Sequence, residues 1–140
     1  MENLRQVVYA SSAVRLMRDP ELLEILEVAR FNNERVKLTG MLLYADGAFI
    51  QVLEAEPANV EKLLRKIRRD CRHRGFLMLI DRIVQERAFD GWSMGFQRTT
   101  LHALNDIAGY QDWSAEMPTR RKTAAAVRLI ESFQHTCARY

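Results

Sequence analysis

The chain has 140 residues, of which 48% are hydrophobic and 28% are charged, a composition ordinary for one globular domain with a buried core. No apolar stretch approaches the roughly 20 residues of a membrane-spanning helix, and the N-terminus lacks the apolar region of a signal peptide, so we expect a cytoplasmic protein without a membrane partner. The net charge is only +3, and Cys71 and Cys137 have neither metal-ligand spacing nor the pattern of a disulfide framework.

The first two predicted elements are a strand and a helix. Residues 5–12 contain an apolar run with strand-forming residues. Asp19 then provides an N-cap, and Pro20 provides a proline at the first helical position. Apolar residues follow at helical spacing, so we expect a helix that ends near Asn33.

Two strands joined by a tight turn follow this helix. The dipeptide Asp46-Gly47 separates the apolar residues 38–45 from residues 48–54. It is a strong hairpin signal, because both central residues of the favoured turn need positive φ. We therefore expect residues 38–45 and 48–54 to pair as antiparallel neighbours.

A second helix and two further strands complete the pattern. Pro57 opens a helix that runs to about residue 70, with apolar residues at i, i+3, i+4 and i+7. Residues 76–84 are mostly apolar and predict a strand. Residues 91–97 predict a last strand, whose large apolar residues share one face.

The order β-α-β-β-α-β-β over residues 1–98 is that of a ferredoxin-like α+β domain with an added strand. We expect a five-stranded mixed sheet with both helices on one face, because each helix has a single apolar stripe to bury. Residues 99–140 predict a C-terminal helical extension, with a short helix followed by a longer one. Its narrow apolar stripe suits the other face of the sheet or a partner.

Gln51 is a primary amide inside the apolar run 48–53, where burial is costly unless the amide finds hydrogen-bond partners. Other polar or polarisable side chains lie in similarly apolar settings: Tyr9, Asn32, Asn33, Trp92 and Met94. Taken singly, each of these is more often a core residue or a helix cap. Together they predict a buried polar network around a group that is not protein.

Alternation along the strands places Tyr9 and Gln51 on faces that can meet beneath the two helices. On the helices, Ile25 and Ile67 occupy apolar positions from which two aliphatic side chains could sandwich a flat ring. Asparagine and glutamine amides could then hydrogen-bond the edge of that ring. A flavin needs such a setting, with apolar faces and amide groups around its carbonyl and nitrogen atoms.

Over about residues 3–98 the chain resembles the BLUF domains, sensors of blue light that use FAD, and in particular the short, free-standing members of that family. Four sets of residues match the family in type, order and spacing: Tyr9, Asn32-Asn33 with residues 38–44, residues 49–54, and Trp92-Ser93-Met94. Ala55 stands where the family often has glycine. The resemblance implies a photosensor domain over residues 1–98 with FAD as its cofactor and FMN or riboflavin as alternatives.

The resemblance also implies roles for the residues that would surround the flavin ring. Tyr9 would donate an electron and a proton to the photoexcited flavin, and Gln51 would bridge Tyr9 to ring atom N5 and the C4 carbonyl. Asn33 would hold the edge formed by N3 and the C4 carbonyl. Asn32 would hold the neighbouring polar edge or the ribityl chain.

Four residues near the end of the second helix are implied on the ribityl-phosphate side of the cofactor: Lys66, Asp70, Arg72 and His73. Arg30 is a weaker candidate for the same side. Basic side chains suit this position because the cofactor carries phosphate groups.

The expected output follows from the amide of Gln51. If this amide returns rotated or tautomerised after the light-driven transfer, its donor and acceptor ends are exchanged and the flavin absorption shifts to the red. Trp92 or Met94 would approach Gln51 and pass the change to the last strand and the helical extension. With only about 40 residues after residue 98, we expect output through a downstream protein or a homodimer, and no enzymatic activity.

Two other classes of function remain open. A ferredoxin-like sheet with a basic helix could bind RNA, and the basic residues of the second helix and its exit are Lys62, Arg65, Lys66, Arg68, Arg69, Arg72 and Arg74. However, the strands lack the aromatic pattern of RNA-binding domains. A flavin-dependent enzyme is the other alternative, although neither a second catalytic constellation nor a nicotinamide-binding motif is present.

Overall fold

The computed structural model describes residues 3–91, 93–99 and 128 of the chain. The elements within these residues are, in chain order, β1 (Leu4–Ala13), α1 (Asp19–Arg35), β2 (Thr39–Ala45), β3 (Ala48–Ala55), α2 (Pro57–Arg69), β4 (His73–Val84) and β5 (Gly95–Thr99). Neither described helix has the length and the apolar composition needed to span a membrane.

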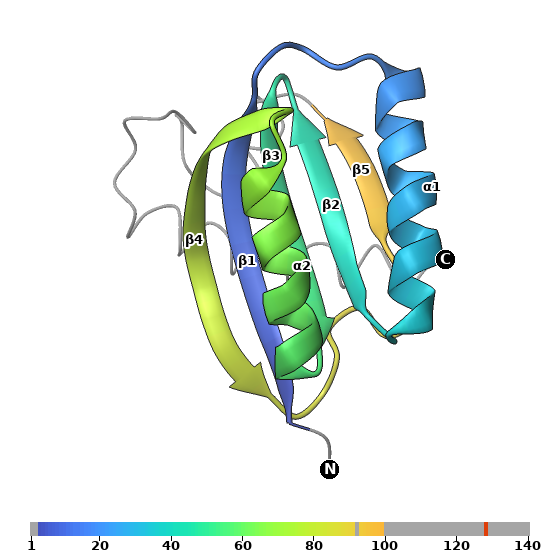
Figure 1. The fold of residues 1–140 in the computed structure, drawn as a ribbon, viewed down its shortest axis with the longest axis vertical. Coiled ribbons are helices and arrows are strands. Elements are labelled where there is room, and N and C mark those ends of the chain that lie inside the picture. Colours follow the sequence, from blue (N-terminus) through green and yellow to red (C-terminus); the bar gives the residue numbers. More distant parts are fainter. Residues whose placement is uncertain (1–2, 92, 100–127, 129–140) are drawn as a thin grey trace.

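The strands form one five-stranded sheet in the order β4-β1-β3-β2-β5 (Figure 1). β1 pairs antiparallel with β3 and β4, and β2 pairs antiparallel with β3. β5 joins β2 in parallel, which makes the sheet mixed. Both helices lie on one face of this sheet (Figure 1). The predicted ferredoxin-like α+β fold with an added strand is therefore confirmed.

The predicted hairpin between β2 and β3 is confirmed by its backbone geometry. Asp46 and Gly47 have φ values of 47° and 93°, and Ala45 pairs with Ala48 directly beside them. A two-residue turn of this kind determines which residues of the flanking strands face each other. In the resulting sheet Gln51 lies opposite Tyr9 of β1.

α1 has proline in its first turn, as predicted, but its N-cap is Arg18 instead of Asp19, and it is longer than the sequence pattern suggested. It continues to Arg35, past the expected end at Asn33, and the chain turns at Lys37, whose φ is 52°. Asn33 is therefore a helical residue with a buried side chain rather than a helix cap. Its amide is turned toward the interior of the protein.

The last strand begins later than predicted, at Gly95 instead of residue 91, so Ser93 and Met94 precede β5. The placement of these two residues within a strand was wrong. Their carbonyl groups accept hydrogen bonds from side chains of α1, Asn33 and Arg30, instead of from a neighbouring strand. Trp92 lies outside the described residues.

Each helix buries one stripe of side chains against the same face of the sheet. Leu22 and Leu26 of α1 and Val60 and Leu64 of α2 are buried, and they share one core cluster with Leu53 of β3. Each buried aliphatic side chain of this size stabilises the fold by about 1.5–3 kcal/mol. The opposite stripe of each helix consequently points away from the sheet.

The second face of the sheet is buried as well, and most of it is apolar. Val8, Ile50 and Val52 are among its buried side chains, and they alternate along β1 and β3 with the residues that face the helices. Thr99, the first residue of the predicted helical extension at 99–140, is the last residue of β5. Of the remaining residues of the extension, only Arg128 is described. The expected place of the extension on this second face therefore stays a prediction.

Candidate functional site

A cavity of about 270 Å³ lies between α1 and α2 and reaches down to the sheet. Its lining brings together most of the residues that the sequence predicted for the site: Tyr9, Ile25, Asn32, Asn33, Gln51, Lys66, Ile67, Asp70, Arg72 and His73. These side chains come from β1, β3, both helices, the connection between α2 and β4, and the start of β4. The fold thus gathers residues that lie more than 60 positions apart in the sequence.

Tyr9 and Gln51 form a buried hydrogen bond on the floor of the cavity. The Tyr9 hydroxyl donates to Oε1 of Gln51, as expected for two residues that face each other across paired strands. Burial raises the pKa of the Tyr9 phenol, and the nearby charge of Asp70 raises it further. The phenol is therefore protonated at neutral pH and available as a donor.

The other end of the Gln51 amide points to Met94. Nε2 of Gln51 donates to the Met94 sulfur over 3.4 Å, and both side chains are buried. The carbonyl end and the amino end of this amide therefore have different partners, a phenol and a thioether. Reversal of the amide would place its oxygen beside a sulfur that has no hydrogen to donate.

Two side chains of α1 hold the segment that carries Met94. Nε of Arg30 donates to the Met94 carbonyl oxygen over 2.9 Å, and Nδ2 of Asn33 donates to the Ser93 carbonyl oxygen over 2.7 Å. Arg30 consequently lies outside the cavity lining, because its guanidinium is turned toward the backbone of this segment. Its predicted place beside the cofactor phosphates has no support in this arrangement.

At the other end of the cavity, Asp70 and Arg72 pair with each other. The Arg72 guanidinium donates to both carboxylate oxygens of Asp70, with Nε 2.9 Å from Oδ1 and 3.0 Å from Oδ2. This pairing lowers the pKa of Asp70 and raises that of Arg72. Both groups are charged at neutral pH, so together they present a dipole to the cavity instead of a free cation.

Both ring nitrogens of His73 have protein partners. Nε2 lies 2.5 Å from the carbonyl oxygen of Ile67, and Nδ1 lies 2.8 Å from the Ser11 hydroxyl. Since a carbonyl only accepts, Nε2 carries the hydrogen and Nδ1 accepts from Ser11 in the neutral ring. His73 therefore links the end of α2 to β1 and has no nitrogen left for a phosphate.

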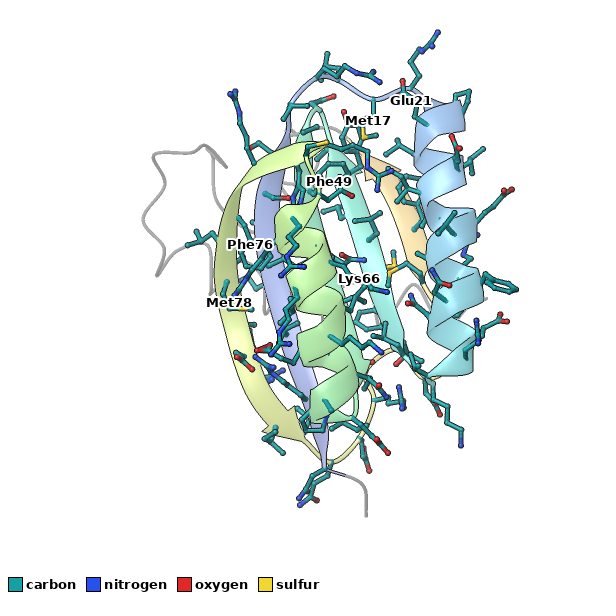
Figure 2. The ribbon with its side chains drawn as sticks, viewed as in Figure 1. Met17, Glu21, Phe49, Lys66, Phe76 and Met78 are labelled. Atoms are coloured by element: carbon teal, nitrogen blue, oxygen red, sulfur yellow. The ribbon has the colours of Figure 1, made fainter. Side chains whose placement is uncertain are left out.

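Lys66 is the basic side chain at the cavity for which the described residues offer no ion pair. In Figure 2 it lies between α2 and α1. The walls around it are apolar, with Ile25 on α1 and Ile67 on α2, and Leu42 and Phe49 line the floor. A flat ring with a negatively charged tail suits this combination.

Sequence reasoning missed three residues around Tyr9. Phe76 stacks on the Tyr9 ring, Arg68 lies over Phe76, and Ser11 lines the cavity. The alternation of strand residues could have revealed Ser11, because it lies two positions after Tyr9 and shares its face. Phe76 could not be found in this way, because the register of β4 shifts beside Tyr9.

The unsatisfied polar atoms of the cavity fit a flavin ring. One of the two amide hydrogens of Gln51 bonds to Met94, and the other has no hydrogen-bond partner within the described part of the chain. Oδ1 of Asn33 likewise has no partner there. Buried amide groups rarely remain unpaired, and the polar edge of a flavin carries both acceptors and a donor for such atoms.

Residues 4–95 match the model of the BLUF family, described as sensors of blue-light using FAD. A curated relative, photoactivated adenylate cyclase subunit alpha of Euglena gracilis, is 35% identical over 106 residues, which is 76% of this chain and 10% of that protein. Subunit beta of Euglena longa is 35% identical over 92 residues, 65% of this chain and 11% of that protein. The chain thus spans about a tenth of these relatives.

Solved structures with the same fold include sensors of similar length. The BLUF protein BlrB in its dark state has a TM-score of 0.71 and 28% identity, covering 91% of this chain and 98% of that one. BlsA in its photo-activated state has a TM-score of 0.75 and 28% identity, with 91% and 94% covered. A bacterial light-regulated adenylyl cyclase has a TM-score of 0.67 and 28% identity, with 98% and 36% covered. These similarities give no support to the RNA-binding alternative.

Proposed function

Because the chain belongs to the BLUF family of blue-light sensors that use FAD, we propose that it senses blue light through the hydrogen bonds of Tyr9, Gln51 and Met94. The observation that supports this proposal most directly is the continuous contact from the Tyr9 hydroxyl through the Gln51 amide to the Met94 sulfur. It runs along the floor of a cavity that fits a flavin ring. One light-sensitive group in this cavity would therefore act on all three side chains.

The cavity residues would hold the flavin in distinct ways. Ile25 and Ile67 provide apolar walls on opposite helices, and Gln51 and Asn33 present unpaired amide atoms to the edge of the ring. Lys66 is the cation best suited to the phosphate side. Ring recognition carries most of the binding, so we expect FMN or riboflavin to be accepted in place of FAD.

When bound, the flavin supplies absorption of blue light and, in its excited state, an acceptor for one electron and one proton. Tyr9 holds the proton at its hydroxyl oxygen, in a hydrogen bond whose acceptor is Oε1 of Gln51. The proton leaves along this bond and returns to Tyr9 when the cycle closes. An amide that comes back reversed loses its bond to Met94, and its amino group then faces the Tyr9 hydroxyl, whose oxygen can accept.

The signal would leave through the segment that holds Met94. Its carbonyl groups are bound to α1 by Arg30 and Asn33, and β5 follows directly. A change at Gln51 is therefore transmitted to the edge strand of the sheet. We take residues 1–98 as the sensor domain and residues 99–140 as the relay to a downstream protein or to a second copy of the chain.

The chain matches only about a tenth of the curated relatives that are named as cyclases, and we propose that it is a cytoplasmic sensor without enzymatic activity of its own. The test is an absorption spectrum of the purified protein before and after blue light. We expect a flavin spectrum that shifts reversibly to the red. A protein that does not bind FAD, or a flavin-loaded protein whose spectrum does not shift, would rule the proposal out.

A further inference from the structure

The outer face of α1 is acidic. Glu24, Glu27, Phe31 and Glu34 follow at i, i+3, i+7 and i+10, which places them in one row along the helix. All four are exposed, Phe31 by 68%. The helix as a whole carries five carboxylates and two guanidinium groups. We refer to these four residues as the acidic row.

The outer face of α2 has the opposite charge. Lys62, Arg65 and Arg69 follow at i, i+3 and i+7, and all three are exposed. Lys66 of the same helix is left out of this set because it lines the cavity. The helix carries five cations and one carboxylate, Glu61. Like charges at this spacing destabilise a helix by a few tenths of a kcal/mol per pair. We refer to Lys62, Arg65 and Arg69 as the basic row.

No charge of either row is neutralised by an ion pair within the described part of the chain. The ion pairs near the rows involve other residues: Glu21 with Arg15 and Arg18, Glu61 with Arg5, and Asp70 with Arg72. The single molecule therefore presents two parallel rows of opposite, unpaired charge on one side of the sheet.

The two helices run antiparallel, and their positions relative to each other follow from the cavities between them. Ile25 of α1 and Ile67 of α2 line the same cavity, whereas Arg35 of α1 and Lys62 of α2 line a second one. The Glu24 end of α1 thus lies beside the Arg69 end of α2. Both helices lie on the same face of the sheet (Figure 1), and their buried residues belong to the core cluster that includes the sheet. Both rows, on the opposite side of each helix, therefore point away from the sheet.

We propose that this helical face binds a second copy of the chain around a twofold axis parallel to the helices. Such a rotation brings the acidic row of each copy onto the basic row of the other. Opposite charges then face each other at both contacts. A twofold axis across the helices would instead place α1 on α1 and α2 on α2, where like charges repel. The favourable arrangement is closed and symmetric, so it ends at the dimer.

The order of residues along the rows also matches. Rotation about an axis parallel to the helices keeps each residue at its height, so Glu24 meets the Arg69 end of the partner helix and Glu34 meets the Lys62 end. Phe31, near the middle of the contact, lies within reach of cationic side chains of the other copy. Cation–π contact there adds to the charge pairing and covers an exposed aromatic ring.

The size of the surface limits the affinity. Helices of 17 and 13 residues are about 25 Å and 20 Å long and about 10 Å wide, so the two outer faces together cover about 400–500 Å². A stable interface buries about 800 Å² on each partner. We therefore expect a weak dimer that forms at high protein concentration and dissociates in salt, because exposed charges are screened.

Charge reversal of each row tests the proposal, with sedimentation velocity of the FAD-loaded protein in the dark as the measurement. The acidic-row variant carries Glu24→Lys and Glu27→Lys, and the basic-row variant carries Arg65→Glu and Arg69→Glu. The wild type is expected to dimerise with rising concentration at low salt, and each variant is expected to stay monomeric. A Glu86→Lys variant, changed at an exposed residue outside both rows, is the control and should dimerise normally.

The decisive sample is an equimolar mixture of the two variants. In a mixed dimer, the reversed acidic row of one chain meets the reversed basic row of the other chain, and the two native rows meet each other. Opposite charges face each other at both contacts, so dimerisation should return. A single chain with all four reversals should dimerise for the same reason, which also shows that the variants fold. A wild type that is monomeric up to millimolar concentration at low salt overturns the proposal. A dimer that still forms after either charge reversal also overturns the proposal. A mixture of the two variants that stays monomeric, although each row still binds some other charged partner, overturns it as well.

Discussion

Phe76 of β4 stacks on Tyr9 of β1, with ring centroids 4.8 Å apart and ring planes inclined by 22°. Phe76 in turn lies beneath Arg68 of α2, whose guanidinium carbon is 4.8 Å from the Phe76 centroid. Aromatic stacking and a cation–π contact thus position the phenol ring from the side of β4. The hydroxyl at its far end is held by Gln51.

Replacement of Phe76 by leucine should destabilise the fold and loosen the Tyr9 ring. Loss of the aromatic pair lowers the free energy of unfolding by about 1 kcal/mol, and a less restricted phenol keeps its hydrogen bond to Gln51 for less of the time. We expect bound flavin with a smaller yield of the red-shifted state, measured by absorption under weak blue light. Phe31→Leu makes the same change at an exposed ring and should alter neither quantity. Equal yields in wild type and Phe76→Leu would show that the stack does not position Tyr9.

Tyr9 should make the protein less stable at alkaline pH. Its pKa is raised in the folded state, so above about pH 10 the unfolded chain releases the phenolic proton while the folded chain keeps it. The free energy of unfolding then falls by about 1.4 kcal/mol per pH unit from this group alone. Tyr9→Phe should remove this part of the slope, measured by urea unfolding from about pH 9 to about pH 11. Identical slopes would mean that the phenol is not shielded by burial.

Gln51→Leu and Met94→Leu should have different consequences. The first removes the amide, so we expect flavin binding without a red shift. The second removes only the sulfur acceptor of the Gln51 amide, so the shift should remain while its dark recovery slows, because the dark orientation loses a stabilising bond. Absorption spectra followed after a light pulse measure both effects. A normal photocycle in Gln51→Leu would eliminate the proposed network.

The parts of the fold that follow from local patterns were predictable. The Asp46-Gly47 turn determines the pairing of β2 with β3, and strand alternation then places Tyr9 and Gln51 on the same side. Contacts between elements that are distant in the sequence were not predictable. The α1 side chains that hold Ser93 and Met94 keep both residues out of β5, and no local pattern reports such long-range bonds. The same limit applies to His73, whose partners belong to two other elements.

Asn33 and Asn32 are adjacent in sequence but should differ in their effect on the cofactor. Asn33 is buried at the cavity and Asn32 is exposed at its rim. Asn33→Ala leaves a buried flavin atom unpaired and should weaken FAD binding by about 1–3 kcal/mol, roughly 5-fold to 150-fold. Asn32→Ala is the matched control with a smaller loss. Fluorescence titration of the flavin-free protein gives both affinities, and equal affinities would remove Asn33 from the cofactor site.

Glu54 is a fully buried carboxylate that holds the segment after β4 onto the sheet. Its Oε2 accepts from Gln6 and from the backbone amide of Ala88, over 2.9 and 2.7 Å. Its Oε1 accepts from Thr39 and from the backbone amide of Phe89, both over 3.0 Å. Four donors therefore converge on one side chain, and two of them belong to the backbone that leads to Met94.

Glu54→Gln should be strongly destabilising although the two side chains have nearly the same shape. The amide nitrogen that replaces one carboxylate oxygen cannot accept, so two of the four donors lose their partner inside the protein. We expect the free energy of unfolding to fall by about 2–4 kcal/mol, together with faster hydrogen exchange at Ala88 and Phe89. Glu86→Gln changes an exposed residue of the same segment and should stay within about 0.5 kcal/mol of the wild type. Urea unfolding and hydrogen exchange of the three proteins provide the measurements. Equal stability of Glu54→Gln and Glu86→Gln would show that the buried carboxylate does not hold this segment in place.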